Sequence, residues 1–365
     1  MDSIVIYGGS FDPIHNGHIR TALASSRYFN AKVIFVPAKN PRFKVPDSTP
    51  KQRLDMLKLA IKDLDPSNFK ISLFEMDSND EVNYSIDTVR YFKNKYKQSN
   101  LYFLIGADEA NSFSKWKEAE AIASIVKIVY VPRPGVKVDK ENIKKYNMIC
   151  LPFNKTGEVS SSGVRKLESI DIPLSVREYI EENGLYFIKE LKKVESQHRL
   201  SHSISVANLS YRIAVSNKIE NRDDYYISGL LHDLGKDLEA SKAKSIMLNN
   251  YPNYVSFPFW TYHQFLGVFL AKKIFDIDNK EILEAIKFHA TGNKNMTVMG
   301  KVIYAADKIE PSRGYDSSAL ISACLSNYED GFIKVLKANR EYLEKKGYIV
   351  DNELTKDCYK QYLGE

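Results

Sequence analysis

The seven histidines of this chain fall into two groups, and histidine side chains can bind phosphate oxygens, transfer protons or coordinate metals. The first group, His15 and His18, lies in the segment GGSFDPIHNGH near the start of the sequence. The second group lies in the second half of the chain, and its members are His198, His202, His232, His263 and His289. No histidine is left over for the surface in this interpretation. We therefore expect two separate sites of phosphate chemistry on one polypeptide.

The first group is preceded by a glycine pair that follows a short apolar run. A strand, a glycine pair and then a helix place backbone N–H groups beside a phosphate. The candidate contacts here are Gly8, Gly9, Ser10 and Phe11. Gly17 separates the two histidines, which as imidazolium groups would hydrogen-bond phosphate oxygens from the first helical turn. The pattern is not the GxGxxG dinucleotide fingerprint, and a helix cap with two surface histidines is the alternative.

The second group combines with two aspartates into a pattern of possible metal ligands. His232 and Asp233 are adjacent in HDLGK, His202 lies upstream, and Asp307 lies downstream. Each side chain offers a nitrogen or oxygen ligand, and helices can bring them together. A lone His-Asp pair would be a helix cap or a surface feature, but the further histidines supply enough ligands for two metals, with Asp233 as the bridge. Iron or manganese suits this mixture better than zinc, because the pattern contains no cysteine.

The elements that must position the first group alternate between strands and helices. Apolar runs rich in Ile, Val, Phe and Tyr predict strands at Ile4–Tyr7, Val33–Val36, Lys70–Phe74, Leu101–Ile105 and Ile128–Val131. Amphipathic stretches predict helices at Pro50–Lys62 and Tyr84–Lys97. This alternation predicts an α/β fold with a doubly wound parallel sheet, Rossmann-like in type. Such sheets bind ligands at the carboxyl ends of their strands, where GGSFDP and LIGAD are expected.

The second half of the sequence has a purely helical period. Apolar residues recur at three- and four-residue spacing in Ser203–Val215, Tyr225–Leu231, His263–Phe275, Lys280–Phe288 and Lys301–Ile309. We therefore predict an all-α second domain, with residues 1–188 and 189–365 as the two domains. Residues 186–189 fit either the end of the first sheet or the linker.

Composition excludes several classes of protein. The chain has 365 residues, 44% hydrophobic and 27% charged, which is typical of a globular protein long enough for two cores. No apolar run would span a bilayer, and no secretory signal is visible, so we expect no membrane association and a cytoplasmic location. The cysteines (Cys150, Cys324 and Cys358) are isolated and typical of a reducing compartment. The net charge of +6 suits anionic small molecules or a lysine-rich surface equally well. No arginine-rich arm predicts nucleic-acid binding, and a homo-oligomer is left open.

The first 188 residues resemble bacterial nicotinate-nucleotide adenylyltransferases of the nucleotidyltransferase superfamily. Beyond GGSFDPIHNGH, the resemblance rests on PRFK, RLDMLKLA, NYSIDTVRYFKNKY, LYFLIGADEANSFSKW, VPRPG, VSSSGVRKL and SVREYIEENGLY. It implies transfer of an adenylyl group from ATP, with Mg²⁺, to nicotinate mononucleotide, which gives deamido-NAD and pyrophosphate. Phe43 stands where the family commonly has histidine, and the arginine that usually precedes Tyr84 is missing. Both departures affect substrate affinity or loop geometry more than the type of reaction.

The resemblance also implies roles for individual residues. His15 and His18 take the phosphate-binding roles, and Lys44 lies near the triphosphate. Gly106 and Asp108 contact adenosine, with Asp108 accepting from a ribose hydroxyl. The remaining implied contacts are Arg133 of VPRPG, the anion site Ser161, Ser162 and Arg165, and the pyridine pocket Tyr84, Ser85 and Trp116. For Trp116 alone, a core anchor is the alternative.

Residues of about 195 to 315 resemble bacterial HD-domain symmetrical diadenosine tetraphosphate hydrolases. The stretches are RLSHS, LLHDLGK, YHQFLGVFLA, AIKFHATG and MGKVIYAADKIEPSR. The resemblance implies hydrolysis of diadenosine tetraphosphate to two ADP by a metal-activated hydroxide. The implied ligands are His202, His232, Asp233 and Asp307 for one metal, and Asp233, His263 and His289 for the other. Lys236 and Arg313 would bind the polyphosphate, and His198 a terminal phosphate or leaving group. A surface salt bridge is the alternative for Arg313.

Two rival interpretations remain at this point. The first changes the substrates, to a pantetheine-phosphate or nicotinamide-nucleotide transferase joined to a nucleotidase or guanosine-polyphosphate hydrolase. The second makes the helical half a nucleotide-sensing module that does not hydrolyse. NYSIDT and the GAD…KW spacing argue against the other transferases, and HATG and EPSR against the other hydrolases. The full set of metal ligands argues against a sensor.

Overall fold

A computed structural model describes residues 2–42, 44–79, 81–152, 159–348, 350 and 352–364 of the chain. The chain divides into two compact units, Met1–Tyr186 and Phe187–Glu365. Each unit is described by itself below. Phe43, which departs from the expected family pattern, lies outside the described residues. The domains predicted at 1–188 and 189–365 are functional assignments and stay a prediction.

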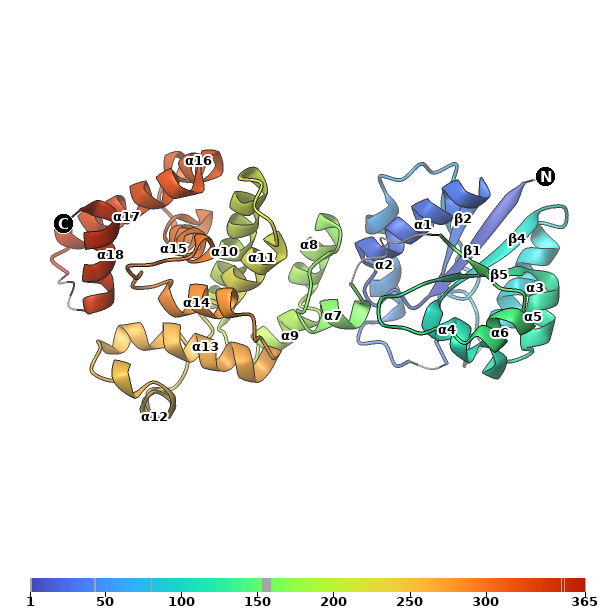
Figure 1. Cartoon of the computed structure of the whole chain (residues 1–365), viewed down its shortest axis with the longest axis horizontal. Helices are drawn as coiled ribbons and strands as arrows, with labels where there is room; N and C mark the ends of the chain where they lie inside the picture. Colours follow the sequence, from blue (N-terminus) through green and yellow to red (C-terminus); the bar gives the residue numbers. More distant parts are fainter. Residues whose placement is uncertain are drawn as a thin grey trace. The chain divides into compact units, whose positions relative to one another are not determined.

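The first unit contains a six-stranded parallel sheet in the order β3-β2-β1-β4-β5-β6 (Figure 1). Its strands are β1 Ser3–Gly9, β2 Lys32–Pro37, β3 Phe69–Ile71, β4 Asn100–Gly106, β5 Lys127–Val131 and β6 Ile149–Cys150. The strand order reverses between β1 and β4, which are neighbours in the sheet. The prediction of a doubly wound parallel sheet is confirmed. The carboxyl ends of β1 and β4 mark the position where such sheets bind ligands.

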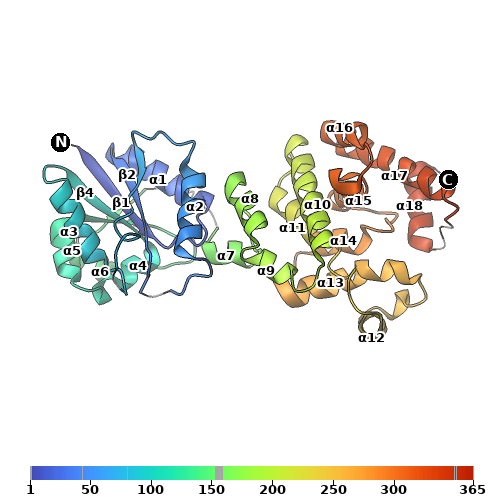
Figure 2. The same cartoon turned by 180° about the vertical axis from the view of Figure 1, so that it is seen from behind.

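Alternating side chains bury both faces of this sheet. One face packs Ile4 and Ile6 of β1 and Phe103 of β4 against α3 (Ser85–Lys95) and α5 (Ala119–Ile125). The residues between them, such as Val5 and Leu104, are also fully buried. Seen from either side, α1 (Asn16–Phe29) and α2 (Pro50–Ile61) lie across the sheet from α3 and α5 (Figure 2). Near-continuous apolar strands are expected for a parallel sheet covered on both faces.

The remaining helices of the first unit are short, and most follow the strands. They are α4 Ala107–Ser112, η1 Phe113–Lys115, α6 Lys140–Lys145, α7 Ser161–Arg165 and α8 Leu174–Asn183. The prediction of a strand through Phe74 was too long, because β3 ends at Ile71. The sequence analysis missed β6, since two residues are too few to show a period.

The second unit contains helices and no strand among its described residues, as predicted. The helices are α9 Phe187–Leu191, α10 Gln197–Ser216, α11 Arg222–Leu231, α12 Ala240–Asn250, α13 Tyr262–Phe275, α14 Lys280–Phe288, α15 Val298–Ile309, α16 Ser318–Ser326, α17 Tyr328–Lys345 and α18 Glu353–Leu363. Short 3-10 turns are η2 Pro252–Tyr254, η3 Phe259–Thr261 and η4 Pro311–Arg313. The ambiguous residues 187–189 form the start of α9 rather than a strand. No helix in the described ranges has the length and apolar character needed to cross a membrane.

Two glycines allow the helices around the second histidine group to approach closely. A Cβ atom at Gly229 of α11 would lie 2.7 Å from the Cα atom of Ala207 in α10. A Cβ atom at Gly235 would lie 2.6 Å from the carbonyl oxygen of His263. Real Cβ contacts are not this short, so a side chain at either position would force these elements apart. The close packing brings the histidines of α10, α11 and α13 within reach of one another.

Candidate active sites

The first unit has a cavity of about 700 Å³ at the carboxyl ends of β1 and β4. The glycine pair after β1 and the two histidines lie on its wall, as do residues from two distant segments. The predicted residues that line it are Gly8, Gly9, Ser10, Phe11, His15, His18, Lys44, Gly106, Arg133, Ser161, Ser162 and Arg165. The fold therefore brings together segments that lie more than 150 residues apart in the sequence, such as Gly8 and Arg165, as expected for a nucleotide site.

The two histidines of this cavity stack on each other at the start of α1. Their ring centroids lie 3.6 Å apart, and the backbone N–H of His15 donates to Nδ1 of His18 at 3.2 Å. Burial lowers the pKa of His15 to about 3, and burial followed by the charge of His15 holds the pKa of His18 well below its usual range. The low pKa values of both rings favour neutral imidazoles over the imidazolium groups expected from the sequence. Each neutral ring still has one N–H to donate to a phosphate oxygen.

Buried charges that the sequence analysis missed hold the loops of this cavity. Arg53 of α2 is 1% exposed and donates to the carbonyl oxygens of Ser10 at 3.0 Å and of Lys39 at 2.9 Å. Asp12 is buried and accepts from the backbone N–H of Asp47 at 2.8 Å. Arg165 donates to the carbonyl oxygen of Asp12 at 2.7 Å. The sequence shows Arg53 and Asp12 only as charges in a helix and a loop, with no spacing that marks them as residues that hold the loops in place.

A second cavity of about 350 Å³ adjoins the first, and seven residues line both, among them Gly8, Lys44 and Arg133. The predicted pyridine-pocket residues Tyr84, Ser85 and Trp116 line only this smaller cavity. Trp116 also packs edge-on against Phe103, so it serves as a core anchor and as a cavity wall. Asp108 lines this cavity rather than the first, and it pairs with Arg133 at 2.9 Å. Its expected contact with adenosine stays a prediction.

Two cations from separate segments lie over the ring of Tyr84 in this smaller cavity. The Nζ atom of Lys117 lies 4.1 Å from the ring centroid, and the guanidinium carbon of Arg42 lies 5.6 Å from it. Both residues line the cavity. The arginine expected just before Tyr84 is missing from the sequence, yet positive charge still surrounds this tyrosine. The sequence analysis did not identify either cation.

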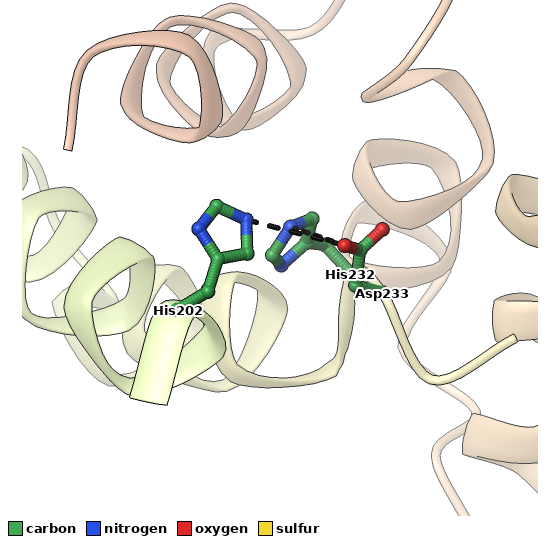
Figure 3. A group of neighbouring side chains, drawn as sticks. All are labelled: His202, His232 and Asp233. Carbon is green, nitrogen blue, oxygen red and sulfur yellow. Dashed lines mark ion pairs between the residues drawn. The ribbon is translucent and has the colours of Figure 1, made fainter. Parts of the chain in front are cut away.

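In the second unit, four histidines and two aspartates converge on one buried cluster. Three overlapping groups of potential metal ligands each have ligand atoms within 4.8 Å of one another. The groups are His202, His232 and Asp233; His232, His289 and Asp307; and Asp233, His263 and His289. Figure 3 shows His202 and His232 arriving from different elements and facing the carboxylate of Asp233. All six predicted ligands lie in this cluster.

The ring orientation of these histidines is fixed by a hydrogen bond on the side away from the cluster. In three of them, Nδ1 donates at 2.7 Å to the carbonyl oxygen three residues earlier: His232 to Gly229, His263 to Trp260, and His289 to Ile286. The fourth, His202, has Nδ1 at 2.9 Å from Oε1 of Glu310, a residue that the sequence analysis missed. Carbonyl oxygens only accept, so in those three rings Nδ1 carries a proton and Nε2 is the nitrogen that faces the cluster. This is the usual arrangement of metal-binding histidines.

The two oxygens of Asp233 divide the cluster into two sides. Oδ1 lies 3.4 Å from Nε2 of both His263 and His289. Oδ2 lies 4.0 Å from Nε2 of His202 and 3.8 Å from Nε2 of His232. Asp307 completes the second side, with Oδ1 at 3.1 Å from Nε2 of His202. This geometry allows Asp233 to bridge two cations.

Several features of the cluster fit metal ions. The Nε2 atom of His232 is fully buried and has no hydrogen-bond partner in the described part of the chain. Nε2 of His263 lies 3.1 Å from Nε2 of His289, although burial lowers the pKa of both rings. Two neutral nitrogens that both present lone pairs repel each other unless a cation lies between them. The donor set of imidazoles and carboxylates is one that divalent transition metals accept.

Protonation and charge in the cluster favour anionic carboxylates. Burial alone would raise the pKa of Asp233, but the imidazoles packed around it, His232 first among them, hold it well below its usual range. The pKa of Asp307 is likewise held low, against burial, by Lys308 and by a hydrogen bond from His202. Burial opposes protonation of His202, yet hydrogen bonds to Asp307 and Glu310 raise its pKa to about 9. Metal binding here would therefore release a proton.

Cationic side chains surround the two carboxylates. Arg199 pairs with Asp233 at 2.7 Å, Lys308 pairs with Asp307 at 2.7 Å, and Arg313 pairs with Asp307 as well. The Nζ atom of Lys236 lies 3.4 Å from Nε2 of His263. Arg313 and Lys236 were predicted to bind polyphosphate, whereas Arg199 was not identified from the sequence.

Comparison with known proteins agrees with both halves of this description. A family model described as "Cytidylyltransferase-like" matches residues 6–167, and the "HD domain" model matches residues 199–312. The chain is 32% identical to the "Probable nicotinate-nucleotide adenylyltransferase/Ap4A hydrolase" of Mycoplasma genitalium over 344 residues, which cover 92% of this chain and 97% of that protein. The chain belongs to this two-domain family.

Shorter proteins also resemble part of the chain. A Clostridium botulinum protein named "Probable nicotinate-nucleotide adenylyltransferase" is 36% identical over 203 residues, which cover 51% of this chain and all of that protein. A crystal structure from Clostridium acetobutylicum, described as a predicted HD superfamily hydrolase involved in NAD metabolism, is 26% identical to this chain. It covers 48% of this chain and 94% of its own, with a TM-score of 0.44.

One prediction about this family member was wrong. The grouping of the histidines predicted none at the surface, but His198 is exposed on the first turn of α10. It lies one helical turn before His202, and Arg199 rather than His198 contacts the metal cluster. Helical spacing shows which residues share a face of the helix, but it does not show where along the helix that face becomes exposed to solvent. A contact between His198 and a substrate phosphate stays a prediction.

Proposed function

We propose that this chain is a bifunctional enzyme. Residues 1–188 transfer an adenylyl group from ATP to nicotinate mononucleotide, giving deamido-NAD and pyrophosphate. Residues 189–365 hydrolyse diadenosine tetraphosphate symmetrically to two ADP. The name of the Mycoplasma genitalium relative supports both assignments, because the two proteins are similar over nearly their full lengths. The strongest single structural support is that two separate groups of histidines occupy two chemically different sites.

For adenylyl transfer, the two adjoining cavities suit two nucleotides held side by side. We assign ATP to the larger cavity, where the glycine pair, His15, His18 and Lys44 face its phosphates. The phosphate of the mononucleotide is itself the nucleophile, so no covalent enzyme intermediate is needed. The chain has to align that phosphate with the α-phosphorus of ATP and neutralise the developing charge. The imidazole N–H groups, Lys44 and Arg165 do this together with Mg²⁺, which shields the phosphates.

The smaller cavity favours nicotinate over nicotinamide. The pyridine ring of nicotinate carries a carboxylate, whereas nicotinamide carries a neutral amide. Lys117 and Arg42 place two positive charges beside Tyr84 in this cavity. An anion gains from both charges, and a neutral amide does not. We therefore propose that these cations help to select the acid form of the substrate.

For hydrolysis, we assign one metal ion to His202, His232, Asp233 and Asp307 and the other to Asp233, His263 and His289. Two metal ions held by these residues would supply an activated water and positive charge beside the phosphate under attack. We propose iron or manganese, because the donor set combines imidazole and carboxylate without a thiolate. Glu310 orients His202, and the carbonyl oxygens orient the other rings. Lys236 and Arg313 bind the negatively charged polyphosphate.

Product analysis tests both activities on the full chain. Incubation with ATP and nicotinate mononucleotide should yield deamido-NAD and pyrophosphate. Incubation with diadenosine tetraphosphate and Mn²⁺ should yield ADP alone. The appearance of ATP plus AMP would exclude symmetrical cleavage. Tight binding of metal and diadenosine tetraphosphate without any turnover would instead support a sensing role for the second half.

A further inference from the structure

Arg199 lies directly beside the metal cluster, and neither the sequence motifs nor the proposed mechanism above gives it a role. It stands in the first turn of α10, three residues before His202, and its side chain is 23% exposed. Its Nη1 atom donates to Oδ2 of Asp233 at 2.7 Å. Its Nε atom is buried and has no hydrogen-bond acceptor among the described residues. Oδ1 of Asp237 lies 3.9 Å from Nε, too far for a hydrogen bond. This guanidinium therefore keeps an unused donor at the edge of the cluster.

The oxygen that Arg199 contacts is the one that faces His202 and His232. Oδ2 of Asp233 lies 4.0 Å and 3.8 Å from the Nε2 atoms of these rings, whereas Oδ1 faces the other two histidines. A metal ion held by His202 and His232 would need this same oxygen. Arg199 and that metal ion therefore compete for the same charge on Asp233.

Arg313 stands in the same relation to the other carboxylate. It is the last residue of η4, and its Nη2 donates to Oδ1 of Asp307, the oxygen that faces His202 at 3.1 Å and His232 at 3.6 Å. Its Nε donates to the backbone carbonyl of Asp307 at 2.7 Å, which anchors the side chain. Two guanidinium groups from separate elements thus contact the two carboxylates of one ligand group.

We infer that Arg199 is a polyphosphate-binding residue that exchanges Asp233 for a substrate phosphate when metal binds, as a counterpart of Arg313. The inference depends on the proposed hydrolase function. A divalent ion takes up the negative charge of Asp233, and the guanidinium then faces a cation instead of an anion. A phosphate oxygen of the substrate would then supply the negative charge that the guanidinium no longer finds on Asp233. Guanidinium groups bind phosphates well because they offer two parallel N–H donors. Nε and Nη2 of a guanidinium present one such pair of parallel donors, and the Nε donor of Arg199 is unused in this structure.

This role predicts opposite effects on metal binding and on substrate binding. Removal of Arg199 removes a competitor of the metal, so Mn²⁺ binding to metal-free full-length Arg199→Ala should tighten severalfold. Removal of the same group deletes a charge-assisted contact to phosphate. The KM for diadenosine tetraphosphate in the Mn²⁺-saturated variant should rise about tenfold, the equivalent of one such bond. In Arg199→Lys the KM should rise less than in Arg199→Ala, because lysine keeps the positive charge but lacks the two parallel N–H donors.

The two quantities are measured separately, by titration of the metal-free protein with Mn²⁺ alone and by steady-state kinetics at saturating Mn²⁺. Arg212→Ala is the matched control, because Arg212 is an exposed residue further along α10. It should change neither quantity. A variant Arg199→Ala that binds Mn²⁺ more weakly, or that keeps the wild-type KM, overturns the inference, since a structural role would weaken metal binding. A wild-type chain that binds Mn²⁺ but does not hydrolyse diadenosine tetraphosphate would instead overturn the proposed function.

Discussion

The two halves of the molecule use histidine in different ways. In the first unit, His15 and His18 lie on the wall of an open cavity formed mainly by loops at the edge of a sheet, and their pKa values are held low by burial. In the second unit, the ring nitrogens point inward from four separate helices or helix ends and share two buried carboxylates. The first arrangement suits N–H donation to a ligand that enters and leaves. The second suits resident cations. The surrounding elements, and not the residue type, decide which chemistry a histidine can do.

The largest expected effect is the loss of hydrolysis in the second unit. Asp233→Ala removes the bridging carboxylate, so hydrolysis of diadenosine tetraphosphate should fall at least about a hundredfold, because even residues that only orient metal ligands cost ten- to a hundredfold. Deamido-NAD synthesis by the same protein preparation should be unchanged, and it serves as the internal control for folding. An equal loss of both activities would show that the two sites are not chemically independent.

The reciprocal substitution acts on the first site. His18→Ala removes one donor to the phosphates, and loss of a single such donor costs about a hundredfold in kcat. We expect adenylyl transfer to fall by that factor while hydrolysis and Mn²⁺ content stay at the wild-type level. Rates of both reactions and metal analysis of the purified variant would check this. A normal rate of adenylyl transfer would mean that the stacked histidines are structural.

The low pKa of His15 predicts a pH dependence of stability for the first unit. As pH falls below 6.5, the unfolded chain binds a proton that the folded chain accepts only near pH 3, so stability decreases by up to about 1.4 kcal/mol per pH unit. His15→Gln should flatten this dependence. The sequence has two tryptophans, so in a Trp260→Phe background the fluorescence of Trp116 reports unfolding of the first unit by urea.

The matched control for this measurement is His198→Gln in the same background, because His198 is exposed and lies in the other unit. Its pH dependence should equal that of the parent. An unchanged slope for His15→Gln would show that His15 is not held neutral.

The smallest expected effect concerns selection between two similar substrates. Lys117→Ala should raise the KM for nicotinate mononucleotide about threefold to fivefold and leave that for nicotinamide mononucleotide unchanged, since exposed charge interactions contribute about 1 kcal/mol or less. Lys115→Ala is the control, because Lys115 is exposed in the same turn but does not line the smaller cavity. Equal changes for both substrates would exclude a role for Lys117 in selection.

The strands with strong apolar runs could be predicted from the sequence, and so could the metal-ligand set, because both depend on local residue type and spacing. β6 could not, since two residues carry no period. The charges that support the sites were missed for a different reason. Arg53, Arg199 and Glu310 act through contacts with segments far along the chain, such as Arg53 with Ser10 and Glu310 with His202. Only the folded structure brings these pairs together.

Three of the metal-facing rings take their orientation from a peptide carbonyl one turn earlier in their own segment. Each ring is thus aimed by four consecutive residues and needs no partner from elsewhere in the unit. A small shift of one helix would move its imidazole with it, and the ring would keep its orientation relative to that helix. The spacing between the bound ions could then be adjusted over evolutionary time through apolar packing residues alone, while every coordinating side chain stays the same.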